Sequence, residues 1–357
     1  MRDSFGREID YLRVSVTDRC NFRCVYCMPE EGYPVSPKDE LLTFEEIARL
    51  VHIAADLGVT KVRLTGGEPL IRRDLPVLIK KIREHREIRD VSCSTNAFLL
   101  PRFAKTLADA GLNRVNISLD TLDAGKFFRI ARRGNLEQVL DGIEAAKRAG
   151  LHPIKINCVL MKGVNDDEAV EFARWTLREE VHVRFIELMP IRWNLDESLE
   201  YDSYQALHGG RGLIRLRIKE DEGMLDGAQM RRMVVPYTAV KERIEKEFGT
   251  MEPCEIITNG PAHTYKLMDA AGTIGFISQI SADLCAKCNR LRLTADGQLR
   301  PCLMSDGELD MRTPLRTGAT DKELSDLFLH VVKHKPERHY LAEGQKVMGR
   351  GMSQLGG

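Results

Sequence analysis

Tyr11-Leu-Arg-Val-Ser-Val16, followed by Cys20-Asn-Phe-Arg-Cys24-Val-Tyr26-Cys27, is the most informative stretch of this chain. Its three cysteines, spaced C-x3-C-x2-C, lie on one short loop directly after a strand-like run. Three thiolates so placed can ligate three irons of a [4Fe–4S] cube and leave the fourth iron free to bind a small molecule. A zinc ion is the alternative, but zinc needs a fourth Cys or His, and none lies between Arg2 and Lys38. The loop therefore indicates an iron–sulfur cluster with an open corner.

Short β-branched runs alternate with longer amphipathic stretches from residue 11 to residue 190. The strand candidates are Tyr11–Val16, Lys61–Thr65, Val91–Thr95, Arg114–Leu119, Ile154–Leu160 and Val183–Leu188. The helix candidates include Thr43–Leu57, which opens with a capping box, and Asn135–Ala149; each is followed by a glycine. Helical segments of this length between strands are typical of βαβ units in a parallel sheet. Six such units predict an α/β fold with an open, partial (βα)6 barrel of the TIM type.

Polar or reactive residues follow five of the six predicted strands. They are the cysteine loop, Gly66-Gly-Glu-Pro69, Ser94-Thr-Asn96, Ser118-Leu-Asp120 and Glu187-Leu-Met-Pro190. The carboxyl ends of parallel strands meet at one edge of the sheet, where α/β enzymes place their active sites. We therefore expect a site at this edge.

The βα pattern stops after residue 190, and residues 195–230 are charged and without a clear period. A smaller C-terminal α+β domain is predicted after a boundary near residue 235, so the chain divides into 1–235 and 236–357. Its elements are Tyr237–Phe248 and Asp321–His334 as helices and Thr264–Met268 and Thr273–Ser278 as strands.

Composition excludes several classes of protein. The 357 residues carry 53 basic and 53 acidic side chains, so no overall charge attracts nucleic acid. No apolar run reaches the roughly 18 residues of a membrane span, and no apolar targeting segment opens the chain. Nine cysteines without a secretory signal favour reduced thiolates over disulfides. We expect a cytoplasmic protein that binds neither a membrane nor nucleic acid.

A second group of cysteines, Cys285, Cys288 and Cys302, has the spacing C-x2-C-x13-C. Three cysteines suit a second [4Fe–4S] cluster with an open iron. A zinc ion is again the alternative, with His263 or His330 as its fourth ligand.

Basic residues point toward a polyanion. Arg290 and Arg292 lie two residues apart on a short predicted strand next to the second cysteine group, which places both guanidinium groups on one face. Arg13, Arg63 and Lys155 lie in or beside three other, mostly apolar strands. Together they favour a substrate such as a nucleoside triphosphate, bound by side chains because the chain has no P-loop and no G-x-G-x-x-G.

These motifs resemble the radical SAM superfamily, whose open iron chelates S-adenosylmethionine (SAM), and within it the GTP 3′,8-cyclase family. The resemblance runs over nearly the whole chain and is carried by the following stretches: the first cysteine loop, Gly66–Pro69, Asn116–Asp120, Lys155–Asn157, Phe185–Met189, Cys285–Arg292 and the terminal Gly356-Gly357. Relative to the family pattern, residues 196–229 look like an insertion.

The resemblance implies a role for each matching residue. Cys20, Cys24 and Cys27 would hold the SAM cluster, and Cys285, Cys288 and Cys302 the second cluster, which binds guanine through its open iron. The SAM contacts would be Tyr26, Gly67, Ser118 and Met189. The GTP contacts would be Arg13, Arg63, Ser94, Lys155, Arg290, Leu291 and Arg292. Arg290, Arg292, Gly356 and Gly357 would act in catalysis, with the tail reaching into the active site.

The implied reaction is the first step of molybdenum cofactor biosynthesis, with two [4Fe–4S] clusters and SAM as cofactors. GTP would become (8S)-3′,8-cyclo-7,8-dihydroguanosine 5′-triphosphate, a lyase reaction that begins with loss of the ribose 3′ hydrogen to a SAM-derived radical. The implied partners are an external one-electron reductant, cyclic pyranopterin monophosphate synthase downstream, and a second copy of the chain in a homodimer. Two alternatives are a peptide-modifying radical SAM enzyme with an auxiliary cluster and a metal-stabilised RNA-binding module.

Overall fold

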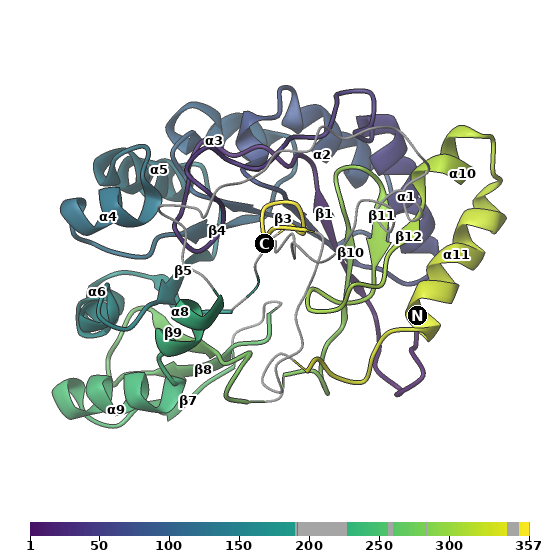
Figure 1. The fold of residues 1–357 in the computed structure, drawn as a ribbon. Coiled ribbons are helices and arrows are strands. Elements are labelled where there is room, and N and C mark those ends of the chain that lie inside the picture. The colour runs from purple at the N-terminus through teal and green to yellow at the C-terminus, as the bar shows by residue number, and fades with distance from the viewer. Residues whose placement is uncertain (190, 192–226, 256–259, 283, 341–349, 357) are drawn as a thin grey trace.

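A twelve-stranded sheet runs through the computed structural model, which describes residues 1–189, 191, 227–255, 260–282, 284–340 and 350–356 (Figure 1). The strand order is β12-β11-β10-β1-β2-β3-β4-β5-β6-β9-β8-β7. The first six strands are β1 Tyr11–Ser15, β2 Lys61–Thr65, β3 Asp90–Thr95, β4 Arg114–Ser118, β5 Ile154–Leu160 and β6 Val181–Glu187. They are parallel neighbours in chain order, which confirms the predicted (βα)6 unit.

Helices connect these strands along one side of the sheet. They are α1 Phe44–Asp56, α2 Leu75–Arg83, α3 Leu100–Asp109, α4 Ala124–Ala131, α5 Leu136–Arg148 and α6 Ala169–Arg178. The predicted capping box is present: Thr43 accepts from the Glu46 N–H, and the Glu46 side chain accepts from the Thr43 N–H. Two 3₁₀ turns, Pro69–Ile71 and Asp166–Glu168, complete the connections.

The parallel strands alternate apolar and polar residues, and this gives the sheet two different faces. The outer face, which packs against the helices, carries fully buried aliphatic side chains such as Val14, Leu64 and Ile156. The inner face carries polar side chains, including Arg13 beside Arg63 in the register of β1 and β2. Sheets covered on both faces usually have apolar residues on both. A polar inner face therefore indicates a cavity for a polar ligand.

The C-terminal part of the chain extends both edges of this six-stranded unit. β10 Arg290–Leu293 pairs in parallel with β1 and continues into β11 Gln298–Arg300 and β12 Leu309–Asp310. On the other side, β9 Thr273–Ile277 pairs in parallel with β6 and continues into β8 His263–Lys266 and β7 Glu252–Pro253. The helices after residue 226 are α8 Gly227–Arg232, α9 Tyr237–Phe248, α10 Arg312–Arg316 and α11 Asp321–Lys333. The domain boundary near residue 235 stays a prediction.

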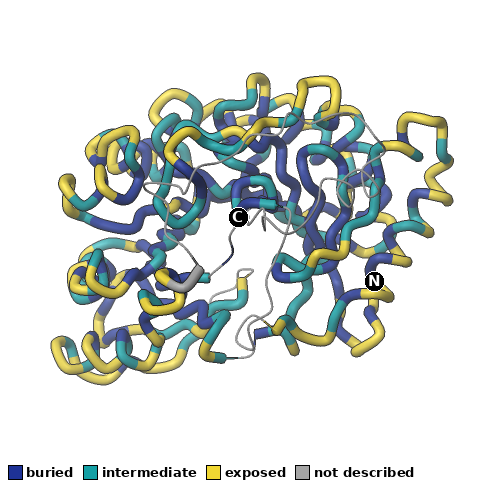
Figure 2. The backbone as a smooth tube through the Cα atoms, in the orientation of Figure 1, coloured by how far each residue is buried: buried dark blue, intermediate teal, exposed yellow. Residues whose placement is uncertain are grey.

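The buried part of the chain follows the strands, while the outer sides of the helices are exposed (Figure 2). Figure 1 shows the helices around the outside and the C-terminal end of the chain at the centre, where Gly356 is hydrogen-bonded to Arg13 of β1. Leu355 and Ser353, close to that end, are 1% and 2% exposed. The last residues are thus packed inside the fold.

The predicted elements agree with the structure to within two residues at most ends. Differences of two residues occur at the end of β8, which stops at Lys266 rather than Met268, and at the start of β6. β6 begins at Val181 rather than Val183 because Val181 and His182 pair with Ile154 and Lys155 of β5. His182 is buried, and its Nδ1 lies 2.8 Å from the Thr273 hydroxyl. The start of β6 therefore includes a polar residue that has a partner inside the fold. Of the predicted insertion at 196–229, residues 196–226 lie outside the described residues, and 227–229 begin α8.

Candidate active site

The loop that carries the first cysteine group (Cys20, Cys24 and Cys27) is held against the Gly66–Pro69 turn by main-chain hydrogen bonds. The Gly67 N–H donates to the Thr17 carbonyl over 2.8 Å, and the Glu68 N–H donates to the Arg19 carbonyl over 2.8 Å. A Cβ on Gly67 would lie 2.1 Å from the Arg19 carbonyl oxygen, closer than any side chain allows. The glycine is therefore needed for the two segments to approach.

The three cysteines of the first group are half-buried. The Cys27 and Met28 N–H groups both donate to the Cys24 carbonyl, over 2.9 and 3.1 Å, which closes the loop into a turn. Burial raises the pKa of Cys20 and Cys27 to about 12, and it raises the pKa of Cys24 well above its ordinary value. After burial, the Glu68 carboxylate raises the pKa of Cys20 further, the Asp120 carboxylate raises that of Cys24, and the Cys20 thiolate raises that of Cys27. A metal that binds thiolate would remove these protons.

Tyr26 lies between the second and third of these cysteines and is anchored to the end of β4. Its hydroxyl donates to the Asp120 carboxylate over 2.7 Å, and the other carboxylate oxygen accepts from the Val159 N–H over 2.8 Å. Burial raises the pKa of Asp120 to about 6, although both hydrogen bonds lower it. Asp120 was part of a predicted motif but received no role from the sequence. Its position ties the cysteine loop to β4 and β5.

Glu68 fixes the ends of β2 and β3 relative to each other. One carboxylate oxygen accepts from the Thr95 hydroxyl over 2.7 Å and from the Leu70 N–H over 3.0 Å, and the other accepts from the Asn96 N–H over 2.7 Å. The side chain is almost fully buried, and burial raises its pKa to about 7. Because both of its carboxylate oxygens are bonded to these neighbours, Glu68 stabilises the arrangement of the strand ends at the site.

The second cysteine group (Cys285, Cys288 and Cys302) lies at the amino end of β10 and just after β11. The Cys288 N–H donates to the Cys285 carbonyl over 3.0 Å, and the Met304 N–H donates to the Cys302 sulfur over 3.3 Å. Burial alone would raise the pKa of Cys288, but the charges of Arg290 and Lys335 outweigh it and bring the pKa to about 6. This environment is more cationic than that of the first group.

Each donor set consists of three free cysteine thiols, which is the donor chemistry of an iron–sulfur cluster with one open iron. Among the described residues, no group of three or more His, Cys, Asp or Glu side chains is arranged to hold one metal ion. One zinc ion draws its sulfur ligands to within roughly 4 Å of each other, since each Zn–S bond is about 2.3 Å. A cubane separates three thiolates over three different irons, so it accepts a wider spacing.

Four of the predicted basic residues meet on the inner face. Arg13 lies beside Arg292 of β10 and Arg63 of β2 in the strand register, and Lys155 of β5 lies one strand beyond β4. Burial, and then the charges of Arg292 and Arg63, lower the pKa of Arg13 well below its ordinary value. Burial and Arg290 lower the pKa of Arg292 to about 9. Buried cations this close repel one another, so a bound polyanion would be stabilised on the inner face.

A further buried cation, Arg184 of β6, belongs to this array and was missed by the sequence analysis. It donates to the Asn116 side chain over 2.6 Å, and burial together with Arg63 lowers its pKa to about 9. The signal that found Lys155, a basic residue inside an apolar strand, was present at Arg184 as well.

Several buried polar atoms on the inner face have no hydrogen-bond partner within the described part of the chain. They are Arg63 Nη2, Arg184 Nε, Asn116 Nδ2, Asn157 Oδ1 and Thr65 Oγ1. Buried polar groups without partners are costly, and they are typical of sites where a ligand supplies the missing bonds. The inner face therefore has both the charge and the free donors to bind a polar anionic molecule.

The C-terminal tail reaches this array. The Gly356 carbonyl accepts from Arg13 and from Arg292, each over 3.0 Å, and Arg292 also donates to the Leu355 carbonyl over 3.2 Å. Arg350 anchors the start of the tail through ion pairs with Asp296 and Glu308 at 2.8 and 2.7 Å. Gly357 lies outside the described residues.

The remaining predicted residues are distributed around this centre. Ser94 pairs with Asn116 in the register of β3 and β4, and Ser118 is exposed at the end of β4. Met189 packs in a small apolar cluster with Cys302 and Leu355. Arg290 is half-buried at the start of β10.

The side chain of Leu291 lies on the opposite face of β10 from those of Arg290 and Arg292, the residues predicted beside it. Its side chain is fully buried in the apolar core of the outer face. A nucleotide on the inner face could meet Leu291 only through its main chain.

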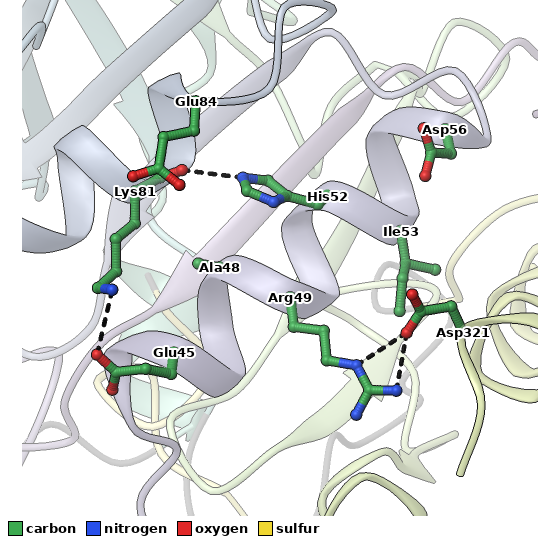
Figure 3. A pocket seen from close by; sticks show the side chains of 9 residues that line it. All are labelled: Glu45, Ala48, Arg49, His52, Ile53, Asp56, Lys81, Glu84 and Asp321. Atoms are coloured by element: carbon green, nitrogen blue, oxygen red, sulfur yellow. Dashed lines mark hydrogen bonds and ion pairs between the residues drawn. The ribbon is translucent and has the colours of Figure 1, made fainter.

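A hollow on the outside of the molecule lies between α1, α2 and α11, away from the predicted residues (Figure 3). Its lining is Glu45, Ala48, Arg49, His52, Ile53, Asp56, Lys81, Glu84 and Asp321. The charged groups there pair with each other, Lys81 with Glu45 at 3.4 Å and Arg49 with Asp321 at 2.8 Å. No cysteine and no residue of the inner face lines it, so it is a surface groove between helices.

Two family models match the chain. The radical SAM superfamily matches residues 14–176, and Molybdenum Cofactor Synthesis C matches residues 214–341. Three relatives called GTP 3′,8-cyclase align over the full length of both chains: from Heliobacterium modesticaldum at 47% identity, Pelotomaculum thermopropionicum at 45% and Thermodesulfovibrio yellowstonii at 44%.

Among solved structures, Streptococcus suis SuiB bound to S-adenosylmethionine has a similar fold. The TM-score is 0.52 at 14% identity, over 90% of this chain and 68% of that one. At such low identity the likeness concerns the fold, and it supports the partial barrel of the radical SAM type. No helix within the described residues is long and apolar enough to cross a membrane.

Proposed function

Because this chain belongs to the GTP 3′,8-cyclase family of radical SAM enzymes, we propose that its two cysteine groups and its cationic inner face together form the cyclase active site. The protein converts GTP to (8S)-3′,8-cyclo-7,8-dihydroguanosine 5′-triphosphate, the first step of molybdenum cofactor biosynthesis, with SAM and [4Fe–4S] clusters as cofactors. The observation that supports the assignment best is the array of buried arginines between the two groups.

In this proposal Cys20, Cys24 and Cys27 hold the first cluster, and Tyr26 and Gly67 shape the pocket for SAM. When bound, the cluster and SAM supply one-electron reduction and a radical that removes a hydrogen atom from the substrate. The residues of the chain itself position the cysteine loop and the SAM pocket. The tyrosine is held by Asp120, and the glycine brings the turn against the cysteine loop. Ser118 and Met189 complete the SAM contacts at the ends of β4 and β6.

The triphosphate is bound by Arg13, Arg63, Lys155 and Arg292, and the guanine lies toward Cys285, Cys288 and Cys302. Ser94, Arg290 and the main chain of Leu291 add contacts along the same face. We include Arg184, since it is as deeply buried and as close to Arg63 as the predicted cations. Charge-assisted bonds from fixed guanidinium groups hold the ribose in one orientation, which favours a reaction between two positions of one substrate.

The Gly356 carbonyl lies on Arg13 and Arg292, and we propose that Gly356 and Gly357 share the active site with the substrate. Because neither residue has a side chain, the tail can lie beside a nucleotide without filling its space.

Variants of single cysteines test the assignment of the two groups. Cys24→Ala is expected to abolish formation of 5′-deoxyadenosine, whereas Cys288→Ala is expected to keep a reducible first cluster and lose the cyclic product. Cys254→Ala, at a cysteine outside both groups, serves as the control and retains activity. The cyclic product at the wild-type rate in Cys288→Ala would show that the second group is structural.

The partners and the location complete the proposal. An external one-electron reductant is required because each turnover consumes two electrons, one for the cleavage of SAM and one for reduction of the cyclised radical, and cyclic pyranopterin monophosphate synthase takes the product. A cytoplasmic location follows from nine free cysteines, which a reducing compartment preserves. A homodimer and a division into domains at residue 235 belong to the same proposal; light scattering tests the first.

A further inference from the structure

Lys335, two residues after the end of α11, is a buried lysine close to the second cysteine group. Its exposed fraction is 3%, although lysine is almost never fully buried without a partner. Its Nζ donates to the Arg290 carbonyl over 2.9 Å and also to the Pro301 carbonyl.

The two carbonyls belong to the two segments that carry the cysteines. Arg290 comes two residues after Cys288, and Pro301 comes immediately before Cys302. Arg290 is the first residue of β10 and Pro301 follows the last residue of β11, so one ammonium group joins the segment that enters this strand pair to the segment that leaves it. Its two hydrogen bonds hold together the segments that carry Cys288 and Cys302.

A second buried cation holds the third cysteine to the same region. Arg7 is 8% exposed and donates to the Cys285 carbonyl over 3.0 Å, and it also donates to the carbonyls of Pro336 and Glu337 over 2.6 and 2.7 Å. Asp3 orients this guanidinium from the other side through an ion pair. The segment 335–337 is thus connected to every part of the second cysteine group.

The charge of Lys335 acts on the thiolates as well as on the main chain. Electrostatic attraction to Cys288 and Cys302 favours the ammonium form, against the cost of its burial. A cluster held by three thiolates is anionic and gains another negative charge when it is reduced. A fixed positive charge beside it stabilises the reduced form most.

We propose that Lys335 is a positioning residue for the second iron–sulfur cluster. Lys335 joins the segments of Cys288 and Cys302, and its charge raises the reduction potential of the cluster. This inference rests on the proposed assignment of Cys285, Cys288 and Cys302 as its ligands. It adds a function to a residue that lies outside the sequence motifs.

The test uses the full chain with Cys20, Cys24 and Cys27 all replaced by alanine, so that only the second cluster is reconstituted. In this background Lys335→Gln removes the charge but keeps N–H donors for the two carbonyls. Lys333→Gln is the matched control, because Lys333 is exposed and the change in net charge is the same. Iron and sulfide per chain and the potential in a spectroscopic redox titration are measured under anaerobic conditions.

Lys335→Gln is expected to lower the equilibrium constant for reduction of the cluster about tenfold, a downward shift of about 59 mV for one electron. Lys335→Met, which loses the hydrogen bonds too, is expected to lose more than half of its iron. Lys333→Gln is expected to match the parent in both measurements. The inference is overturned if Lys335→Gln and Lys335→Met both match Lys333→Gln in iron and in potential.

Two further variants keep the result interpretable. If circular dichroism shows that Lys335→Gln does not fold, the titration is done on Lys335→Arg, for which a potential near that of the parent supports the inference and a large shift at full iron content contradicts it. Adding Cys288→Ala to the same background must remove the cluster. If iron persists there, the assignment of the ligands has failed, which is a different result from equal potentials in the Lys335 variants.

Discussion

Lys155 shows how one side chain can make substrate binding depend on pH. Burial, and then the charges of Arg184, Arg114 and Arg63, lower its pKa to about 6, so it is largely neutral above pH 7 without a ligand. A triphosphate favours the ammonium form, and binding therefore takes up a proton. Affinity for GTP falls as the pH rises from 7 to 9, by up to about tenfold per unit.

Calorimetry in two buffers with different ionisation enthalpies measures this proton uptake. We expect close to one proton per GTP at pH 8 for the wild type and much less for Lys155→Met, whose side chain fills similar space without titrating. Equal uptake in both proteins would assign the proton to another group. SAM binding, measured in parallel, is expected to be unaffected by the substitution.

Gly356 is the residue where the tail is most sensitive to a side chain. Its φ is +71°, and a Cβ would lie 2.5 Å from the Thr65 hydroxyl oxygen. Gly356→Ala is expected to raise the free energy of the docked tail by about 1–2 kcal/mol from backbone strain alone. The rate of cyclisation is then expected to fall about tenfold or more, while iron content and SAM binding are retained.

Gly318→Ala is the matched control for this prediction. Gly318 has a φ of +92°, but nothing lies within 4 Å of the position of its Cβ. The control thus carries a comparable backbone strain at an exposed loop far along the chain from the tail. Product formation at the wild-type rate in Gly356→Ala would mean that the tail is not part of the active site.

At the scale of the elements, Glu187 connects the end of β6 to the segment that leads into the second cysteine group. Its carboxylate accepts from the N–H groups of Ile280 and Ser281 over 3.0 and 2.9 Å, and from the Tyr237 N–H at the start of α9 over 3.2 Å. The residue is 3% exposed, so these bonds are made without competition from water. β6, α9 and the 280–281 turn therefore move as one unit.

We predict that Glu187→Ala costs roughly 2 kcal/mol or more of the free energy of unfolding, because it leaves three main-chain donors without their acceptor. Iron bound by the second cysteine group is expected to fall more than iron bound by the first. Glu180→Ala, at an exposed glutamate just before the same strand, is the control. Chemical denaturation and iron analysis of both variants decide the question, and equal values would exclude a supporting role for Glu187.

At the scale of the whole molecule, the C-terminal strands are needed to complete the sheet. β9 covers one edge of the six-stranded unit and β10 covers the other, both by parallel pairing. A fragment of residues 1–235 would expose both edges, and unpaired edges promote association. We predict that this fragment aggregates or unfolds without a cooperative transition, as seen by size-exclusion chromatography and circular dichroism.

Deletion of Gly356 and Gly357 is the control for this truncation, since it leaves both edges paired and is expected to leave the Tm unchanged. A monomeric 1–235 fragment with the Tm of the full chain would instead show that the proposed N-terminal domain folds without the C-terminal strands.

The sequence alone determined the local features of this protein. The strands at Lys61–Thr65 and Ile154–Leu160 and the helix Tyr237–Phe248 agree with the structure residue for residue, because alternation and capping are carried by neighbours in the chain. The two cysteine groups could be found for the same reason, since each is defined by short spacings.

Only the tertiary structure decided which distant segments share the site. The Gly356 carbonyl meets Arg13 across 343 residues of chain, and Lys335 joins segments on either side of β10 and β11. Arg184 enters the cationic array only once the sheet curves and brings β6 toward β2. Such contacts depend on strand order and on the packing of two sheet edges, which no local pattern encodes. The physical reason is that the free energy of strand pairing is summed over the whole sheet, whereas sequence periodicity depends on only a few neighbouring residues.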